Sequence, residues 1–478
     1  MNICTENKNV WCIEKIAHLG FLQDADKYYQ AFFEALPQAR KDVFISAWEL
    51  ESKVNLAKVS SELPSDLRRY FSYLARDNRH LRIKISCWKP GLYLKFSRER
   101  LAEYKWSKVS HAGVLYRSER SPYAFGSFHE KIVLVDNSCG FLGGMDVSTN
   151  RWDTPSHDIG SDFKEKNEGY YLPVHDVQFI FTGPLLKKTR QMIDLREMGR
   201  PRKKREYPVT RIRLNLDYPH LNNTLGSLSR TDPELNAYEI ESLYIDAIRK
   251  AKKFIYIENQ YFSCLPIAKE LAKRLEEEDG PEIVIVLPYN YIGGFERAIY
   301  IHGRNKVQRI LQKADKYHRL GIFYPSIPNE KQDQFLKVHS KVMIVDGMFI
   351  TLGSANLNYR SMRLDREINL NIEANRTKER VFIRKVLRTL VCEHLGIQET
   401  EYMPNRTLLE NIRFFQNLYP RTLKSLDYGT LNFKERAMLL VSPFVDMKKA
   451  IPKAIFWSIF VLVMIFLMLS MKMTYEII

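Results

Sequence analysis

The segment His129-Glu-Lys-Ile-Val-Leu-Val-Asp136 returns later in the chain as His339-Ser-Lys-Val-Met-Ile-Val-Asp346. Each copy then reaches a pair of small residues and a side-chain carbonyl, first as Gly143-Gly144-Met145-Asp146 and then as Gly353-Ser354-Ala355-Asn356. Every matched position of the second copy lies 210 residues beyond its counterpart. Because chance rarely repeats so many positions at fixed spacings, we predict two copies of one structural unit.

The four residues between each Lys and Asp are apolar and rich in β-branched side chains, which is typical of a short buried strand. Side chains alternate between the two faces of a strand, so His129 and Lys131 project together, as do His339 and Lys341. Glycines after the next apolar run permit the backbone to approach a bound group closely. Each copy thus predicts a His and a Lys presented together at the start of a strand.

The repeat extends beyond these motifs. Ala39-Arg-Lys-Asp-Val-Phe-Ile-Ser46 resembles Ala251-Lys-Lys-Phe-Ile-Tyr-Ile-Glu258, each a basic helix end that runs into a strand. Further strands are predicted at 81–87 and 283–287, and Asp176 and Glu367 each open a later alternating run. The expected fold class is therefore α/β, with two repeated lobes of mixed sheets flanked by helices.

These residues resemble the phospholipase D superfamily, whose signature is the paired HxK-x4-D motif. Three further strings are similar to the eukaryote-like branch of that superfamily: Arg151-Trp-Asp153, Ile257-Glu-Asn-Gln-Tyr-Phe262 and Arg360-Ser-Met362. The resemblance covers residues 25–400. It implies a bilobal fold with the active site at the seam where both motif copies meet.

Two His and two Lys supply what phosphodiester cleavage needs, namely a nucleophile, a proton donor and positive charge near the phosphate oxygens. Imidazole can form a covalent phosphoryl intermediate, and this chemistry requires no metal or other cofactor. The resemblance implies that His129 is the nucleophile and His339 the general acid and base. Lys131, Lys341, Asn356 and the glycine backbone are expected to stabilise the charge on the phosphate.

The acidic residues divide into two groups. The resemblance implies that Asp176 and Glu367 each orient the histidine of their own half. Asp136 and Asp346 are expected to make structural hydrogen bonds at the strand ends. Asp146 stands where nucleases of the superfamily often carry Asn, and a carboxylate near a phosphate is unfavourable unless it points away or is protonated. This substitution favours the eukaryote-like branch.

The net charge of +17 suits an anionic partner, and both membranes and nucleic acids qualify. Nine basic residues lie between Lys187 and Arg205, which indicates either a solvated linker or a surface for lipid headgroups. The six cysteines are scattered without close pairs, which weakly favours free thiols in a reducing compartment. No cleavable secretory signal is apparent at the N-terminus.

Residues 454–471 contain 18 positions without an ionisable group, so we expect a single transmembrane anchor there. Lys448, Lys449 and Lys453 precede it, which predicts catalytic lobes on the cytoplasmic side. A buried core helix is the alternative. The predicted organisation is an N-terminal segment 1–24, lobes at 25–198 and 237–400 around a linker 199–236, an extension 401–453 and the anchor.

The predicted activity is hydrolysis of a glycerophospholipid to phosphatidic acid and headgroup through a phosphohistidine, with transphosphatidylation when an alcohol replaces water. Two alternatives are a phosphatidyltransferase of the cardiolipin synthase type and a membrane-anchored nuclease, for which the basic charge is apt. An inactive membrane-bound scaffold is a fourth interpretation, disfavoured because neither His-Lys pair is degraded. The residues specify neither the headgroup nor the oligomeric state.

Overall fold

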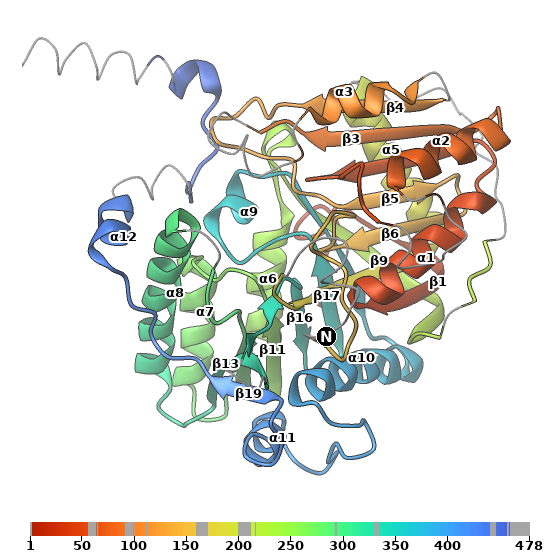
Figure 1. Cartoon of the computed structure of the whole chain (residues 1–478). Coiled ribbons are helices and arrows are strands. Elements are labelled where there is room, and N and C mark those ends of the chain that lie inside the picture. Colours follow the sequence, from red (N-terminus) through yellow and green to blue (C-terminus); the bar gives the residue numbers. More distant parts are fainter. Residues whose placement is uncertain are drawn as a thin grey trace, which may run out of the picture.

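Two similar lobes lie side by side in the computed structural model, the first coloured red to yellow and the second green to blue in Figure 1. The structure describes residues 2–55, 64, 66–90, 99, 101–110, 113–158, 171–198, 212–215, 217–291, 294–328, 334–439, 446–456 and 458.

The first lobe is built on a mixed sheet. Three parallel strands form one side of this sheet: β2 (Asp42–Ala47), β3 (Arg82–Trp88) and β4 (Val114–Glu119). Antiparallel strands follow from β2 in the order β5 (Ile132–Val135), β6 (Cys139–Gly143), β8 (Val177–Thr182) and β1 (Cys12–Gln23). The helices of this lobe are α1 (Asp24–Ala35), α2 (Leu67–Asp77), α3 (Ala102–Ser107) and α5 (Pro184–Met198).

The second lobe repeats this plan strand by strand. Its parallel strands are β11 (Phe254–Glu258), β12 (Glu282–Val286) and β13 (Leu320–Ile327). Its antiparallel strands follow from β11 as β16 (Val342–Val345), β17 (Phe349–Gly353), β18 (Glu367–Glu373) and β9 (His220–Asp232). Its main helices are α6 (Glu239–Lys250), α7 (Leu265–Glu276), α8 (Gly294–Ala314) and α10 (Thr377–Leu395). The predicted α/β repeat is therefore confirmed.

Strands β1 and β9 join the two lobes. They pair antiparallel with each other, while β1 also pairs with β8 and β9 also pairs with β18. The sheet therefore continues from one lobe into the other. The ranges 1–24 and 199–236, predicted as a terminal segment and a linker, contain the strands β1 and β9. The Asn222-Asn223 pair and Gly226 indicate a turn locally, but pairing on both edges and burial of Leu221 and Leu228 stabilise a strand instead.

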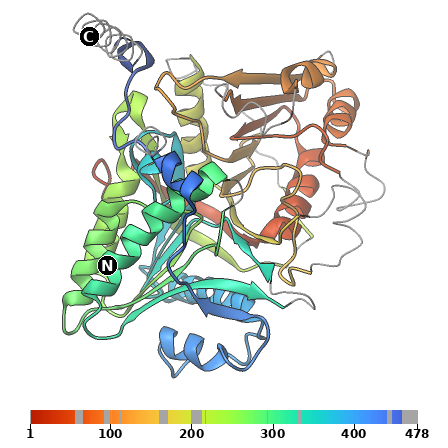
Figure 2. The same cartoon turned by 60° about the vertical axis from the view of Figure 1, so that its left-hand side comes forward.

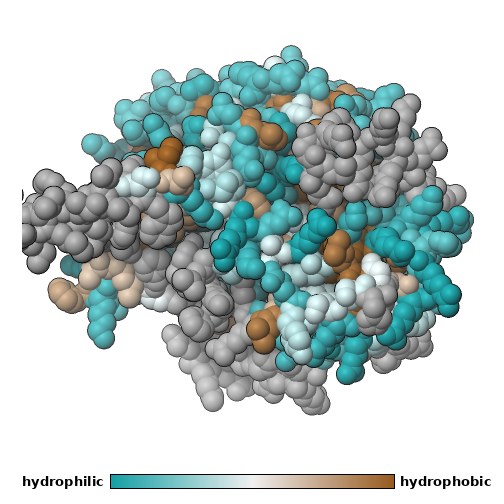
Figure 3. All heavy atoms as spheres, turned by 90° about the horizontal axis from the view of Figure 1, so that it is seen from above, coloured by the Kyte–Doolittle hydropathy of each residue, from teal (hydrophilic) through white to brown (hydrophobic). Residues whose placement is uncertain are grey.

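Apolar residues fill both faces of the sheet. Residues of α6 and α7 pack with Ile255 and Ile283 on the outer face of the second lobe, where these helices lie in Figures 1 and 2. The opposite face shares one core between the lobes, since it joins Ile132 and Leu134 of β5 with Ile344 of β16. The two motif-bearing strands thus belong to one packed interior. Figure 3 shows a mostly hydrophilic outer surface on the coloured part of one face.

Short elements complete the described chain. They are β7 (Val174–His175), β10 (Ala237–Tyr238), β14 (Gln334–Phe335), β15 (Lys337–Val338), α9 (Tyr359–Arg363), α11 (Leu408–Phe415), β19 (Thr422–Ser425) and α12 (Phe433–Met438). Within the described ranges, no helix has the length and hydropathy needed to cross a bilayer. Most of the anchor predicted at 454–471 lies outside these ranges, as does the basic stretch 199–205.

Candidate active site

Each His motif is held by the backbone of the opposite lobe. The main-chain N–H of His129 donates to the carbonyl oxygen of Arg366 over 2.9 Å, and that of His339 donates to the carbonyl oxygen of His175 over 2.8 Å. Strand β15, which leads to His339, pairs parallel with β7, which contains His175. Each motif therefore begins beside the residue that precedes the acid of the other lobe.

The acids are exchanged between the lobes as a result. His129 Nδ1 lies 3.0 Å from both carboxylate oxygens of Glu367, and His339 Nδ1 lies 2.5 Å from Asp176 Oδ2. The expectation that each acid orients the histidine of its own half was wrong. The sequence offset shows that the two acids occupy equivalent places in the repeat. Which histidine each acid contacts is determined by the segments that lead to His129 and His339, because each of them pairs with the opposite lobe. Acid pairing at Nδ1 leaves Nε2 of each imidazole for substrate chemistry.

Glu367 is fully buried and held from two sides. Ser354 Oγ donates to Glu367 Oε2 over 2.5 Å and Ser361 Oγ donates to Oε1 over 2.6 Å. Burial raises the pKa of Glu367 to about 7, although Lys131 and the two hydroxyl donors oppose the shift. Burial also raises the pKa of Asp176, against the charge of Lys341. Both acids are thus fixed by their surroundings before any ligand binds.

The two lysines are buried next to their histidines. Lys131 Nζ donates to the carbonyl oxygen of His129 over 2.8 Å, and Lys341 Nζ donates to that of His339 and to Gln260 Oε1, the latter over 3.3 Å. Burial lowers the pKa of Lys341. Both ammonium groups thus lie beside the backbone of the histidine two positions earlier.

Both histidines are poor bases in this environment. Burial, followed by the charges of Lys131 and Lys341, lowers the pKa of His129 well below its usual value. Burial and then Lys341 and Arg151 lower the pKa of His339 in the same direction. Lys341 therefore acts on the histidines of both motifs, which indicates that they share one electrostatic environment. The lowered pKa values favour the uncharged form of both rings.

Asp146 is oriented by two groups of its own lobe. Its Oδ1 accepts the main-chain N–H of Trp48 over 3.0 Å, and its Oδ2 lies 3.3 Å from Lys131 Nζ. These contacts account for a carboxylate at this place, because the lysine compensates its charge. Asn356 is buried, and its Oδ1 meets no donor within the described chain, so this amide is available to a ligand.

Asp136 and Asp346 hold strands together rather than face the histidines. Asp136 accepts the main-chain N–H groups of residues 40, 41 and 42, and Asp346 accepts those of residues 252, 253 and 254, all within 3.0 Å. Both have a positive φ, 51° and 57°. These contacts agree with the structural role predicted for both residues.

The glycines after each motif pack closely against neighbouring groups, one of which is the acid Asp176. A Cβ added to Gly144 would lie 2.3 Å from Asp176 Oδ1, and one added to Gly143 would lie 2.2 Å from Gln178 Oε1. A Cβ on Gly353 would lie 2.3 Å from the main-chain carbonyl oxygen of Ile368. These glycines thus allow close approach to side chains and backbone at β8, the residue before it and β18, while approach to a bound group stays a prediction.

Four further residues also belong to this site: three come from strings already quoted for the family resemblance, and one, Lys337, was not singled out from the sequence. Arg151 and Lys337 add positive charge that lowers the pKa of His339, and Ser361 and Gln260 contact Glu367 and Lys341. The alternation of Lys337, His339 and Lys341 at every second position is a signal that could have identified Lys337.

Comparisons of the sequence with known proteins give related results. A family model described as "Cardiolipin synthase, PLD-like domain" matches residues 244–383. Phospholipase D A of Dictyostelium discoideum is 25% identical over 411 residues, which cover 73% of this chain and 32% of that protein. Cardiolipin synthase of Alkalihalophilus pseudofirmus is 23% identical over 365 residues, covering 72% of this chain and 63% of the relative.

A solved structure supports the fold. The crystal structure of phosphatidylserine synthase from Haemophilus influenzae has a TM-score of 0.57 at 14% identity, covering 90% of this chain and 94% of that one. The chain spans about a third of the Dictyostelium protein and about half of phospholipase D beta 2 from Arabidopsis thaliana. With its duplicated His-Lys motifs on duplicated lobes and a PLD-like domain match at residues 244–383, the chain is similar to the phospholipase D superfamily.

Proposed function

We propose that the chain is a membrane-associated phospholipase D-type phosphodiesterase that cleaves a glycerophospholipid into phosphatidic acid and free headgroup. The crossed pairs His129–Glu367 and His339–Asp176 carry this proposal, because they orient two imidazoles from opposite lobes with a buried lysine beside each. Such a set offers a nucleophile and a proton donor within one electrostatic environment.

In the first step, His129 Nε2 attacks phosphorus and the bond from phosphorus to the headgroup oxygen breaks. The anionic phosphate raises the proton affinity of the neighbouring ring, and His339 gives its proton to the leaving oxygen. In the second step His339 accepts a proton from water, the water oxygen attacks phosphorus, and the P–N bond breaks. Lys131, Lys341 and Asn356 stabilise the phosphate oxygens in both steps.

Several features support a lipid substrate. The relatives described above include a phospholipase D and a cardiolipin synthase. The excess of 17 positive charges favours an anionic membrane surface. The apolar stretch 454–471 is proposed as a C-terminal anchor, with the lobes on the cytoplasmic side because lysines precede it.

The test is headgroup release from vesicles of defined phospholipids by the full-length protein, with and without a primary alcohol. Phosphatidic acid in water and a phosphatidyl alcohol in alcohol are expected. The variants His129→Asn and His339→Asn should each lose at least about 100-fold of the rate, the lower range for one acid or base group. Intact folding of each variant is checked by circular dichroism.

The cardiolipin synthase interpretation is the second candidate, because the matching family model carries that name. It predicts transfer to glycerol or to a second lipid even when water competes. Cleavage of oligonucleotides without headgroup release would instead establish a nuclease. Product analysis by mass spectrometry separates these outcomes.

The nucleophile is assigned by trapping. Because the P–N bond of phosphohistidine hydrolyses in acid, digestion is carried out at neutral or alkaline pH, and the phosphoryl group is located by peptide mass after rapid quenching. Label on His129 is expected. Label on His339 alone would reverse the roles, and an active enzyme that never carries label would exclude the covalent mechanism.

A further inference from the structure

A second group of ionisable side chains is buried behind the Asp176–His339 pair. Each member is at most 7% exposed, and the members come from both lobes: Asp24, Asp153, His157, His175, Glu258, Glu393 and His394. None of them is needed as nucleophile, acid or phosphate ligand in the reaction above. So many charged groups away from water require a compensating arrangement.

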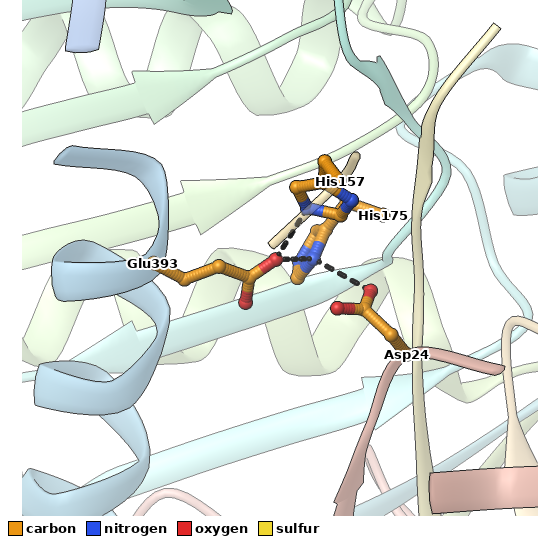
Figure 4. Close-up of side chains that lie close together, drawn as sticks. All are labelled: Asp24, His157, His175 and Glu393. Atoms are coloured by element: carbon orange, nitrogen blue, oxygen red, sulfur yellow. Dashed lines mark hydrogen bonds and ion pairs between the residues drawn. The ribbon is translucent and has the colours of Figure 1, made fainter. Parts of the chain in front are cut away.

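Four of these side chains converge on one point, drawn in Figure 4. Glu393 extends from α10 and its Oε1 lies 2.8 Å from His157 Nε2 and 2.7 Å from His175 Nδ1. Asp24 Oδ1, at the start of α1, lies 3.1 Å from the same His175 nitrogen. One ligand atom from each of the four lies within 4.8 Å of the others.

The outward nitrogen of each imidazole already has a carboxylate partner. His157 Nδ1 lies 3.1 Å from Asp153 Oδ2, and His175 Nε2 lies 3.0 Å from Glu258 Oε2. A neutral imidazole has only one N–H group. If that group donates outward, the inward nitrogen presents a lone pair to Glu393, and this contact needs either a second ring proton or a metal ion between the two groups. A carboxylate behind each ligating histidine is the usual arrangement around protein-bound metals.

Asp24 provides an independent sign of a ligand. It is fully buried, and its Oδ2 has no hydrogen-bond donor in the described part of the chain. The fold thus keeps an unpaired carboxylate oxygen among the four converging side chains.

We infer that Asp24, His157, His175 and Glu393 form a binding site for one divalent transition metal, with Zn²⁺ as the best match. Two imidazoles and two carboxylates suit zinc, whereas Ca²⁺ and Mg²⁺ take oxygen ligands almost exclusively. Zinc bonds of about 2.0–2.2 Å place tetrahedral ligand atoms roughly 3.3 Å apart. The three N···O separations of 2.7–3.1 Å would expand by a few tenths of an ångström, and the remaining pairs, all within 4.8 Å, would contract toward the same spacing.

The metal would position the general acid without touching the substrate. Asp24 and Asp176 are joined by two hydrogen bonds, from Asp24 N to Asp176 O over 2.9 Å and from Asp176 N to Asp24 Oδ1 over 3.2 Å. The carbonyl oxygen of the ligand His175 accepts the main-chain N–H of His339. Fixing Asp24 and His175 therefore fixes both members of the Asp176–His339 pair.

A cluster without metal is the competing state. Without metal, two protonated histidines bring a total charge of +2 to the four surrounding carboxylates. With metal, two neutral histidines and one divalent ion bring the same +2, so charge balance alone does not decide between the two states. Metal content does decide. It is measured by plasma mass spectrometry on the full-length protein, purified without chelator and then dialysed, and it is independent of catalytic activity.

About one zinc per chain is expected in the wild type. The same amount is expected in His129→Asn, because His129 lies in the candidate active site and is not one of the four proposed metal ligands. The variants His157→Ala and Glu393→Gln should retain less than a fifth of that amount. Should either variant fail to fold, the wild type is stripped with chelator and titrated with Co²⁺. Visible d–d absorption at one equivalent is expected, and it should disappear when Zn²⁺ is added.

A folded wild-type protein that contains no stoichiometric metal and takes up neither Zn²⁺ nor Co²⁺ would overturn the inference. So would full metal retention in folded His157→Ala and Glu393→Gln proteins. Metal loss in the variants together with unchanged headgroup release would keep the site but remove its positioning role. A wild type that binds metal yet releases no headgroup would refute the proposed function and leave the metal site intact.

Discussion

Nδ1 of His129 lies 3.0 Å from both carboxylate oxygens of Glu367, a residue that comes 238 positions later in the chain and belongs to the other lobe. The same exchange joins His339 to Asp176. Each imidazole therefore depends on a strand of the opposite repeat for its tautomer and orientation. Damage to one lobe should impair the histidine of the other.

The exchange predicts which step each acid supports. Asp176→Asn should weaken His339 as general acid, so its effect should depend on the leaving group. We expect a loss of about 100-fold or more with phosphatidylcholine but less than about 10-fold with a p-nitrophenyl ester, which needs no protonation. Glu367→Gln should slow attack by His129 about equally on both substrates. The measurement is the burst rate of the first turnover.

Suppose that His129 is shown to carry the phosphoryl group. A Glu367→Gln variant that recovers activity with the p-nitrophenyl ester, beside an Asp176→Asn variant that does not, would then contradict the assignment of the two acids. Asp146→Asn serves as a matched control. Its carboxylate contacts Trp48 and Lys131 rather than either imidazole. It should show no dependence on the leaving group.

Asp136 and Asp346 should matter for stability. Replacement of either by Ala leaves three main-chain N–H groups without their acceptor and should lower the free energy of unfolding by about 3 kcal/mol. Replacement by Asn should cost less than half of this, because Asn keeps one acceptor and tolerates a positive φ. Urea denaturation monitored by tryptophan fluorescence gives both values. If all four variants had the free energy of unfolding of the wild type, these contacts would contribute nothing to stability.

Gly144→Ala should disturb catalysis through the acid. The added Cβ would lie 2.3 Å from Asp176 Oδ1 and must displace that carboxylate from His339. We expect a loss of activity of about 10-fold or more that resembles the leaving-group pattern of Asp176→Asn. Gly294→Ala is the control, since among the described residues its Cβ would meet only Met438 Cε, 3.9 Å away. Wild-type rates for Gly144→Ala would show that the carboxylate does not need its present position.

The lowered histidine pKa values predict the pH profile. A general acid must hold its proton, so lowering the pKa of His339 moves the loss of activity to lower pH. On a soluble short-chain phospholipid, kcat/KM reports the free enzyme and should fall as pH rises from below about 6.5, the ordinary value for histidine. Bound phosphate opposes the shift, so the alkaline limb of kcat should lie at higher pH. If the alkaline limbs of kcat/KM and kcat coincided at a pH above 6.5, the result would contradict this prediction.

The paired motifs were sufficient to predict the duplicated α/β fold, because strand patterning and a 210-residue offset are local and repeated. They also located both His-Lys pairs and both acids. The spacing carries no information on which acid meets which histidine, since that depends on β7 and β15 pairing across the lobes. Strand β9 was missed for a related reason: its polar sequence becomes a strand only between β1 and β18.

The buried cluster was the least accessible to sequence reasoning. Asp24, His157, His175 and Glu393 lie in four separate segments without a shared motif, and only the folded chain brings their atoms within 4.8 Å. His175 was next to a predicted acid, but a histidine at the start of a strand has no distinctive pattern. Long-range convergence of this kind has no periodicity to detect.

The exchanged acids also bear on how such a chain could have arisen. A single ancestral repeat would have carried a histidine and a lysine but would have needed its acid from a second copy. A dimer with twofold symmetry satisfies that need reciprocally, because each copy gives and receives the same contact. Gene duplication and fusion then remove the requirement for assembly and free the two histidines to diverge in role. Co-expression of separated halves should therefore restore an activity that neither half has alone.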